Sequence, residues 1–210
     1  MRAQLAADRV EAQLQALRAQ INPHFLFNAL NSIKRFILKN ENDAAESYLT
    51  KYSHHIRDIL HYSRKLTLSI HQEVTLLERY VEIEKIRTGE VFQFKVEIDN
   101  NIDQYETFIP TMVIQPFVEN AIWHGILKER KGQISLSFKK IEDQIQIRLE
   151  DNGVGFDGGI QTGDDSLGIS LVQERIRLIG VHYNSRTNLK VTSRPGGGTQ
   201  VLMLIPADLI

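Results

Sequence analysis

The chain has 210 residues, of which 25 are Lys or Arg, 26 are Asp or Glu and none is Cys. This length allows one large domain or two smaller ones. The balanced charge gives no reason to expect nucleic acid as a partner, and the lack of Cys excludes disulfides and thiolate zinc sites. No run of 18 apolar residues predicts a membrane span, and the charged N-terminus has no signal-peptide core. It begins in a helical repeat without a capping residue, which predicts a missing upstream part.

Residues 3–38 are predicted to form one long helix that is interrupted at Pro23. Apolar residues before the proline have the alternating four-three spacing of a coiled coil: Val10, Leu14, Leu17 and Ile21. A second row follows it, two residues out of phase: Leu26, Leu30, Ile33 and Ile37. The shift predicts that the packing seam moves at the proline and leaves His24 and Asn28 on its flank.

A loop and helix cap are expected at residues 40–43, and a second helix at about 43–63. Its apolar face comprises Ala45, Leu49, Tyr52, Ile56 and Ile59. Two long amphipathic helices with a short connection favour an antiparallel hairpin. Because one hairpin buries too little surface to be stable, a dimeric four-helix bundle is the expected fold of this part.

From about residue 66 the pattern favours an α+β domain with a mixed sheet and helices on one face. Strands are predicted at 67–70, 92–98, 134–138, 145–149, 189–193 and 199–205, with a hairpin turn at Glu142 and Asp143. Helices are predicted at 73–88, 111–126 and 168–180, and a polar, glycine-rich loop at 156–166. The whole chain is therefore expected to be a helical hairpin followed by an α/β sandwich.

Pro23 and His24 are the most informative pair in the chain. A proline inside a helix removes a backbone donor and costs roughly 3 kcal/mol. His24 follows it directly, and Asn28 lies four residues later on the same helical face. A kink, a titratable ring and an amide at one place indicate a functional use.

Two glycine motifs in the second half indicate a site for a flat ligand. Asp151 begins an Asp-x-Gly-x-Gly turn directly after an apolar strand, and three glycines at 196–198 precede Thr199. Glycines let the backbone pass close to a ligand, and the carboxylate can accept the exocyclic amine of adenine. Each motif alone is also compatible with an ordinary strand-exit or hairpin turn.

Glu119 and Asn120 lie on a predicted helix among apolar neighbours, one turn before His124. They could be a plain surface pair. A half-buried Asn120, however, would offer an oxygen ligand of the kind that magnesium takes.

Joined in this order, the motifs resemble sensor histidine kinases with a nucleotide domain of the gyrase and chaperone ATPase superfamily. Within that family the chain looks like the LytS-like, autolysin-regulator branch. The branch marks are the sequences at 22–25, 84–87 and 115–121. The resemblance covers nearly the whole chain.

The resemblance implies that His24 is the phosphoacceptor, that Asn120 binds magnesium and that Asp151 reads adenine. It implies that ATP is contacted by Asn120, His124, Lys128, Asp151, Gly153, Gly155, Gly168, Gly196, Gly198 and Thr199. Gly168 matches the ATP lid, and the glycines from 196 onward match the last glycine motif. An amide at the offset of Asn28 implies a role in dephosphorylating the partner; the alternative is a polar residue that fixes helix register.

The sequence departs from the family pattern in three places. Trp123 stands where relatives often have a phosphate-contacting lysine, so Lys128, Arg130 or Lys131 is expected to substitute for it. The lid has one matching glycine, where many kinases have two or three. Phe25 follows His24 where many kinases have an acid, which leaves Glu119 as the candidate base.

Residues 1–65 are therefore predicted to be a dimerisation and phosphotransfer domain, and 66–210 an ATP-binding domain. The resemblance implies transfer of the γ-phosphoryl group of ATP to His24, with Mg²⁺, and then to an aspartate of a response-regulator receiver domain. It also implies a homodimer and an absent upstream sensor in the membrane, with this chain as the cytoplasmic portion.

Two other functions stay open at this point. One is an ATPase of the same superfamily without histidine kinase activity. Such enzymes place a water-activating glutamate one turn before the magnesium asparagine, where this chain has Pro116. The other is a binding module with an inactive nucleotide domain, which Trp123 and the sparse lid would permit.

Overall fold

The structure, a computed structural model, describes residues 23–63, 65–89, 92–127, 132–157 and 164–209, with only the backbone at 23–26 and 164–168. The chain divides into two compact units, residues 1–64 and 65–210. Among the described helices, none is long and apolar enough to cross a membrane. The predicted helix before Pro23 lies outside the described residues, so the kink there stays a prediction.

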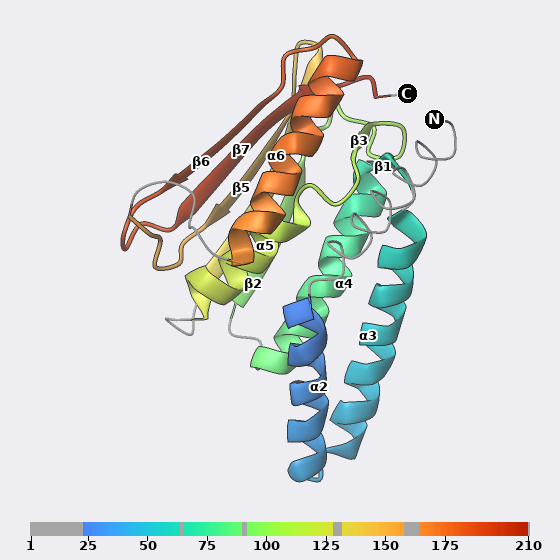
Figure 1. Cartoon of the computed structure of the whole chain (residues 1–210), viewed down its shortest axis with the longest axis vertical. Helices are drawn as coiled ribbons and strands as arrows, with labels where there is room; N and C mark the ends of the chain where they lie inside the picture. Colours follow the sequence, from blue (N-terminus) through green and yellow to red (C-terminus); the bar gives the residue numbers. More distant parts are fainter. Residues whose placement is uncertain (1–22, 64, 90–91, 128–131, 158–163, 210) are drawn as a thin grey trace, which may run out of the picture. The chain divides into compact units, whose positions relative to one another are not determined.

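The first unit contains a helical hairpin of α2 (Pro23–Leu38) and α3 (Asn42–Tyr62), as predicted (Figure 1). The connection turns at Asn40, which has a positive φ of 58°. The N-cap of α3 is Glu41, and its side chain makes no capping hydrogen bond. The loop therefore ends one residue earlier than expected, and the turn depends on the left-handed backbone that Asn tolerates.

Small and aromatic side chains form the buried face of this hairpin. The buried residues are Ala29, Ser32 and Phe36 on α2 and Tyr48, Tyr52, His55 and Ile59 on α3. The rings of Phe36 and Tyr48 lie 5.8 Å apart, and those of Tyr48 and Tyr52 stack at 6.2 Å. Packing of such aromatic pairs stabilises the hairpin beyond the area that they bury.

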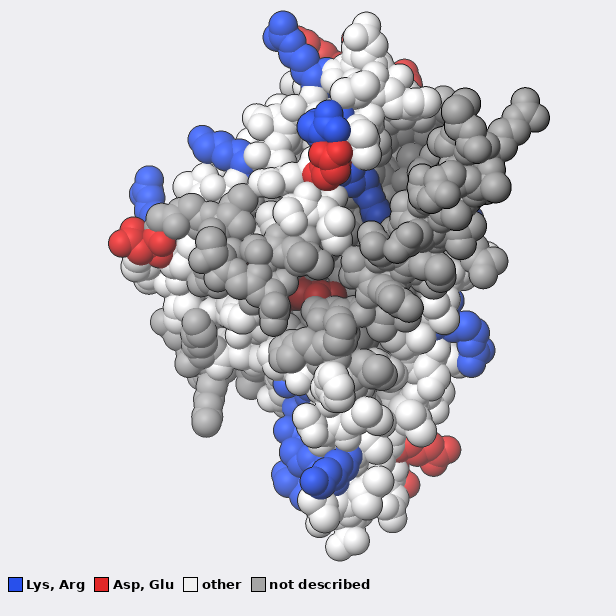
Figure 2. Space-filling view, in the orientation of Figure 1, with Lys and Arg blue, Asp and Glu red and all other residues white. Residues whose placement is uncertain are grey.

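The apolar row predicted as the seam of α2 is not the buried face of the hairpin. Leu30 and Ile37 are 55% and 56% exposed, and Leu49 on α3 is 49% exposed. The hairpin thus has a second apolar surface besides its internal one. Figure 2 shows basic side chains gathered at the lower end of the hairpin, where α2 contains Lys34 and Arg35 and Lys39 follows it.

The second unit is built on a five-stranded mixed sheet, which confirms the α+β prediction (Figure 1). Its strands, in spatial order, are β2 (Phe92–Ile98), β4 (Gly132–Ile141), β5 (Gln144–Asp151), β7 (Thr199–Pro206) and β6 (Asn188–Ser193). β2 and β4 pair in parallel, while the other pairs are antiparallel. Parallel neighbours need a crossover, and the segment between them contains the helices that later form the site.

One face of the sheet is apolar because alternate residues of each strand point to it. The buried members are Ile134, Leu136 and Phe138 on β4, Ile145, Ile147 and Leu149 on β5, and Val201, Met203 and Ile205 on β7. α6 (Asp164–His182) lies across the sheet in Figure 1. The predicted arrangement, with helices on one face, is confirmed.

Several predicted boundaries are wrong. A helix predicted at 73–88 is α4 (Ile70–Thr88), because Ser69 and Gln72 form a capping box. A short strand, β3 (Phe108–Pro110), pairs with β1 (Thr67–Ser69) and was not predicted. The helix predicted at 111–126 begins only at Gln115 and comprises α5 (Gln115–Asn120) and a π-helix, η1 (Ala121–Ile126). α6 begins four residues before its predicted start at 168.

Glu73, a buried carboxyl group on α4, holds the turn that leads into α5. Its oxygens accept hydrogen bonds from the backbone N–H groups of Met112, at 2.9 Å, and Ile114, at 3.5 Å. Met112 has a positive φ of 55°. The Arg175 side chain of α6 donates to the carbonyl of Thr111 in the same turn. Burial raises the pKa of Glu73 to about 7, although the backbone donors and Arg175 oppose that shift.

We expect Glu73→Gln to change how stability depends on pH. With a folded-state pKa of about 7 against an ordinary 4.5, the raised pKa favours folding fully below pH 4.5, and this contribution is lost as pH rises to 7. At 1.36 kcal/mol per unit, the change is at most about 3 kcal/mol. Urea unfolding at pH 5 and 7.5 measures it.

Glu73→Gln should lack this fall in stability with pH. The difference in unfolding free energy between the natural protein and the variant should therefore change with pH. The matched control is Glu78→Gln, which alters an exposed carboxylate on the same helix. Parallel pH curves for the natural protein and Glu73→Gln would contradict the assignment.

Candidate functional site

A mostly apolar cavity opens in the second unit between the sheet and its helices. Residues from α5, η1, α6, three strands and the Asp-x-Gly-x-Gly turn line it. They are Phe117, Asn120, Ala121, His124, Gly125, Leu149, Asp151, Gly155, Phe156, Ile169, Val191, Thr199 and Val201. An apolar cavity with few polar groups is the usual form of a small-molecule site.

Asp151 at the end of β5 is the only carboxylate among these lining residues. It is 8% exposed, and its Oδ1 accepts a hydrogen bond from the Gly153 N–H at 2.9 Å. Burial raises the pKa of Asp151, while hydrogen bonds from Gly153 and Thr199 lower it. Apolar walls around one buried acceptor suit a flat ring with an exocyclic amine, as adenine offers.

Three glycines around Asp151 let separate backbone segments come into contact. A Cβ at Gly153 would lie 2.4–2.5 Å from the backbone of Gly125, and one at Gly198 would lie 1.9 Å from the Asp151 carbonyl oxygen. Gly198 also has a positive φ of 72°. A side chain at Gly125 would approach the Asp151 carboxylate at 3.0 Å. The cavity can therefore form only where these positions lack side chains.

The two glycine motifs form one structure rather than two independent turns. The Gly196 N–H donates to the Val154 carbonyl at 2.7 Å, and the Arg194 N–H donates to the Gly198 carbonyl at 3.2 Å. Ser193 Oγ accepts from the Phe156 N–H at 2.9 Å. These contacts favour the ligand-site interpretation over two ordinary turns, because isolated turns would not need each other.

Asn120 and His124 reach the cavity from consecutive turns of one helical segment. Asn120 ends α5, and His124 lies in η1, where the Leu127 N–H donates to the Ile122 carbonyl five residues back, at 3.0 Å. The Val154 N–H donates to the Gly125 carbonyl at 3.3 Å. The π-helix thus meets the Asp-x-Gly-x-Gly turn directly, and such helices are frequent at functional sites.

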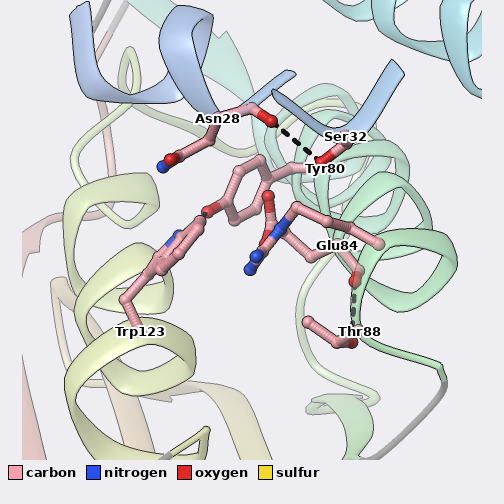
Figure 3. A network of polar contacts seen from close by, with 7 residues as sticks. Asn28, Ser32, Tyr80, Glu84, Thr88 and Trp123 are labelled. Atoms are coloured by element: carbon pink, nitrogen blue, oxygen red, sulfur yellow. Dashed lines mark hydrogen bonds and ion pairs between the residues drawn. The ribbon is translucent and has the colours of Figure 1, made fainter. Parts of the chain in front are cut away.

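Trp123, the residue before His124 in η1, belongs to a polar network with α4 (Figure 3). Its indole N–H donates to the Tyr80 hydroxyl at 3.2 Å. The guanidinium of Arg87 lies 3.7 Å from the centre of the Trp123 ring, which is a cation–π contact. Arg87 also donates twice to Glu84 Oε2, at 2.6 and 2.9 Å.

Not every residue predicted for the site is brought to the cavity. Thr199 and Gly155 line it. Gly153 does not line it, but its N–H donates to the Asp151 carboxylate. Glu119 does not line it and instead accepts a hydrogen bond from Gln115 at 3.0 Å. Gly168 lies in α6.

Other predicted residues lie elsewhere in the chain. Lys128, Arg130 and Lys131 fall outside the described residues. His24 and Asn28 lie in α2, in the other unit.

Sequence reasoning missed the apolar walls of the cavity. Phe117, Phe156, Ile169 and Val191 line it from four separate elements. Periodicity alone assigns such residues to the core, so only the positions of Phe117 and Phe156 beside the motifs offered a signal. Among the described residues no cluster of His, Cys, Asp or Glu could hold a metal by itself. A metal at Asn120 would have to share its coordination with oxygens of a ligand.

Comparisons with known proteins agree with this geometry. Residues 12–92 match the family described as Histidine kinase, and residues 107–209 match Histidine kinase-, DNA gyrase B-, and HSP90-like ATPase. Putative uncharacterized protein YwpD of Bacillus subtilis is 31% identical over 202 residues, covering 92% of this chain and 69% of that protein.

The chain belongs to the histidine kinase family. Sensor histidine kinase YesM of Bacillus subtilis is 31% identical over 93% of this chain, and Sensor protein LytS of Bacillus anthracis is 28% identical over 93% of it. The chain spans 33% and 34% of their lengths. The name LytS agrees with the predicted branch, and the ATPase match supports the use of ATP.

A solved structure also agrees with the fold. The histidine kinase domain of the Erythrobacter litoralis EL346 blue-light activated histidine kinase gives a TM-score of 0.51 at 18% identity. The match covers 95% of this chain and 96% of that one. At this identity the match supports the fold of the chain alone.

We expect Gly153→Ala to damage the cavity of the second unit. The added methyl group must displace the backbone of Gly125, 2.5 Å away or less. Overpacking of this kind costs about 1–3 kcal/mol. Thermal unfolding and titration with a nucleotide should both show the loss.

Gly197→Ala is the matched control, because its Cβ would meet only Arg194 at 3.3–3.5 Å and Gly197 has no positive φ. If Gly153→Ala were as stable as Gly197→Ala and bound nucleotide equally well, the close approach of Gly125 and Gly153 would not matter to the site.

Proposed function

We propose that this chain is an ATP-dependent protein-histidine kinase that phosphorylates its own His24. The observation that carries the proposal is the buried carboxylate of Asp151 at the end of an apolar cavity, in the part that matches the ATPase family. His24 lies on α2, within the part that matches the histidine kinase family. A nucleotide site and a phosphoacceptor are the two components that such a reaction requires.

The cavity residues would divide the nucleotide between them. Asp151 accepts the exocyclic amine of adenine, and Phe117 and Ile169 contribute to the apolar walls around the ring. Asn120 would hold Mg²⁺ through its amide oxygen, together with phosphate oxygens of the nucleotide, and the bound metal would supply positive charge for the transferring group. Gly155, Gly168, Gly198, Thr199, His124 and Lys128 complete the proposed contacts with ATP.

Phosphoryl transfer then needs few covalent steps. A neutral imidazole nitrogen of His24 attacks the γ-phosphorus, the bond to the β–γ bridging oxygen breaks, and ADP leaves. Imidazole has an ordinary pKa near 6.5, so most of it is neutral at physiological pH. The phosphoryl group passes from the histidine to an aspartate carboxylate of a response-regulator receiver domain.

The proposed roles of the two domains follow from their surfaces. Residues 1–65 would form the dimerisation and phosphotransfer domain, because the hairpin exposes Leu30, Ile37 and Leu49. A second copy of the hairpin would bury this surface in a four-helix bundle. Residues 66–210 would form the ATP-binding domain. Since the chain spans a third of YesM and LytS, we propose that a sensor region precedes it and that the full protein lies in the membrane with this part in the cytoplasm.

One detail separates the kinase from an ATPase of the same superfamily. The ATPases have a water-activating carboxylate one turn before the magnesium asparagine. In this chain that position is Pro116, in the first turn of α5, which has no carboxylate. Glu119 lies next to Asn120 and interacts with Gln115. We keep Glu119 as the candidate base for His24.

His24→Gln should abolish self-phosphorylation and leave ATP binding nearly unchanged. Asp151→Asn should lose both, because an amide nitrogen replaces an acceptor oxygen. Incubation with γ-labelled ATP and Mg²⁺ measures the first property, and acid lability of the label identifies phosphohistidine. Label that persists on His24→Gln would exclude this residue as the acceptor. Normal ATP binding by Asp151→Asn would place the nucleotide elsewhere.

Asn28 is proposed to assist dephosphorylation of the regulator. It lies one turn after His24 on α2 and is half-buried, with its carbonyl accepting from Ser32 Oγ at 2.8 Å (Figure 3). An amide can orient an attacking water without taking its proton.

Asn28→Ala should keep self-phosphorylation and lengthen the lifetime of the phosphorylated regulator, followed after removal of ATP. Loss of the dimer or of self-phosphorylation would instead assign Asn28 to helix register, and Asn31→Ala, on the exposed side of α2, serves as the control.

A further inference from the structure

The second unit contains an arginine whose side chain is held against Trp123, a neighbour in sequence of the cavity residues Asn120 and His124. Arg87, in the last turn of α4, donates through Nε and a terminal nitrogen to Glu84 Oε2, at 2.9 and 2.6 Å. Its guanidinium lies 3.7 Å from the centre of the Trp123 ring. The side chain is 14% exposed. Two contacts of different kinds therefore hold one cation in a defined position.

Arg87 contacts Trp123, which lies in the helical segment that lines the cavity, and the described part of this lining has no positive charge of its own. The described lining residues include no Lys or Arg, whereas the polyphosphate of a nucleotide carries several negative charges. Trp123 lies between Asn120 and His124, which both line the cavity. The ring that supports Arg87 is thus part of the same helical segment as these two residues.

The proposed adenine and phosphate ends of the cavity show which arginine could contact the phosphates. Asp151 would mark the adenine end, and Arg194 belongs to this end, because its carbonyl lies beside Gly155 and its N–H bonds the Gly198 carbonyl. Asn120 would mark the phosphate end, because Mg²⁺ binds phosphate oxygens. Arg87 is joined to this second end through Trp123.

Glu84, the carboxylate that holds Arg87, is itself unfavourable for folding. It is fully buried, and its Oε1 has no hydrogen-bond partner in the described structure. A buried carboxylate that is only partly satisfied costs free energy. On α4, Thr88 bonds the Glu84 carbonyl at 2.7 Å and so fixes the backbone of this turn (Figure 3). The arrangement orients a guanidinium, the group best suited to phosphate oxygens.

We propose that Arg87 is a nucleotide-binding residue that contacts the polyphosphate, with Trp123 and Glu84 as the residues that position it. The assignment rests on the proposed ATP site. Arg87 would supply the positive charge that the polyphosphate needs, and it lies within the described part of this unit. Arg87 should therefore distinguish ligands by their phosphates and should not affect recognition of the adenine ring.

The test compares adenosine, ADP and a non-hydrolysable ATP analogue, each titrated with Mg²⁺ into the natural chain and into Arg87→Met. We expect the affinity for the ATP analogue to fall about tenfold or more, that for ADP to fall less or equally, and that for adenosine to change less than twofold. Arg87→Lys keeps the charge but not the planar fork, so it should retain part of the affinity. Arg79→Met, an exposed arginine two turns earlier on α4, is the matched control.

An equal loss for adenosine and the ATP analogue in Arg87→Met would overturn the assignment and make the residue structural. If Arg87→Met fails to fold, Arg87→Lys decides: unchanged adenosine affinity with a reduced preference for the ATP analogue supports the assignment, and an equal loss for both ligands overturns it. Unchanged affinity for the ATP analogue would overturn it as well, and so would an equal loss in Arg79→Met. If the natural chain bound none of the three ligands, the proposed ATP site itself would fail, and the assignment of Arg87 with it.

Discussion

The close approach of three backbone segments around one buried carboxylate is the constraint on which the rest of the site depends. Asp151 ends β5, Gly198 begins the return to β7, and Gly125 lies in the π-helix. Each segment comes from a different part of the chain, and a single methyl group at Gly153 or Gly198 would separate them. The sheet register sets where β5 and β7 end, so strand pairing and ligand geometry are one requirement rather than two.

Much of this fold could be predicted from local patterns. Alternation of apolar residues located β2, β4, β5 and β7, because one face of each strand is buried and the other is not. The motifs around Asp151 and Gly198 were recognisable because glycines and a following polar residue stand next to each other in the sequence. That the two motifs form one structure, through Gly196 and Val154, could not be predicted, because the hydrogen bond joins residues far apart in the chain.

Tertiary contacts explain what sequence reasoning predicted wrongly. The helix at 115–126 begins late because the preceding turn is held by Glu73, a residue about forty positions earlier in the sequence. The π-helix accepts a hydrogen bond from the Asp-x-Gly-x-Gly turn, a contact between distant segments that local propensity does not reveal. In the hairpin, Ala29 and Phe36 rather than Leu30 and Ile37 face inward. Both rows have helical spacing, so periodicity alone could not decide which one packs within the chain.

Trp123 shows most clearly that the role of a side chain depends on its tertiary contacts. Considered by itself, a tryptophan beside Asn120 removes positive charge from the phosphate end of the site. In the structure its ring carries the guanidinium of Arg87, and its indole N–H bonds Tyr80. An aromatic face attracts a cation and restricts its rotation, so less conformational entropy is lost when that cation binds a ligand. The cation that we propose for the phosphate end therefore comes from another helix, α4, and both an uncharged ring and the Glu84 carboxylate hold it in position.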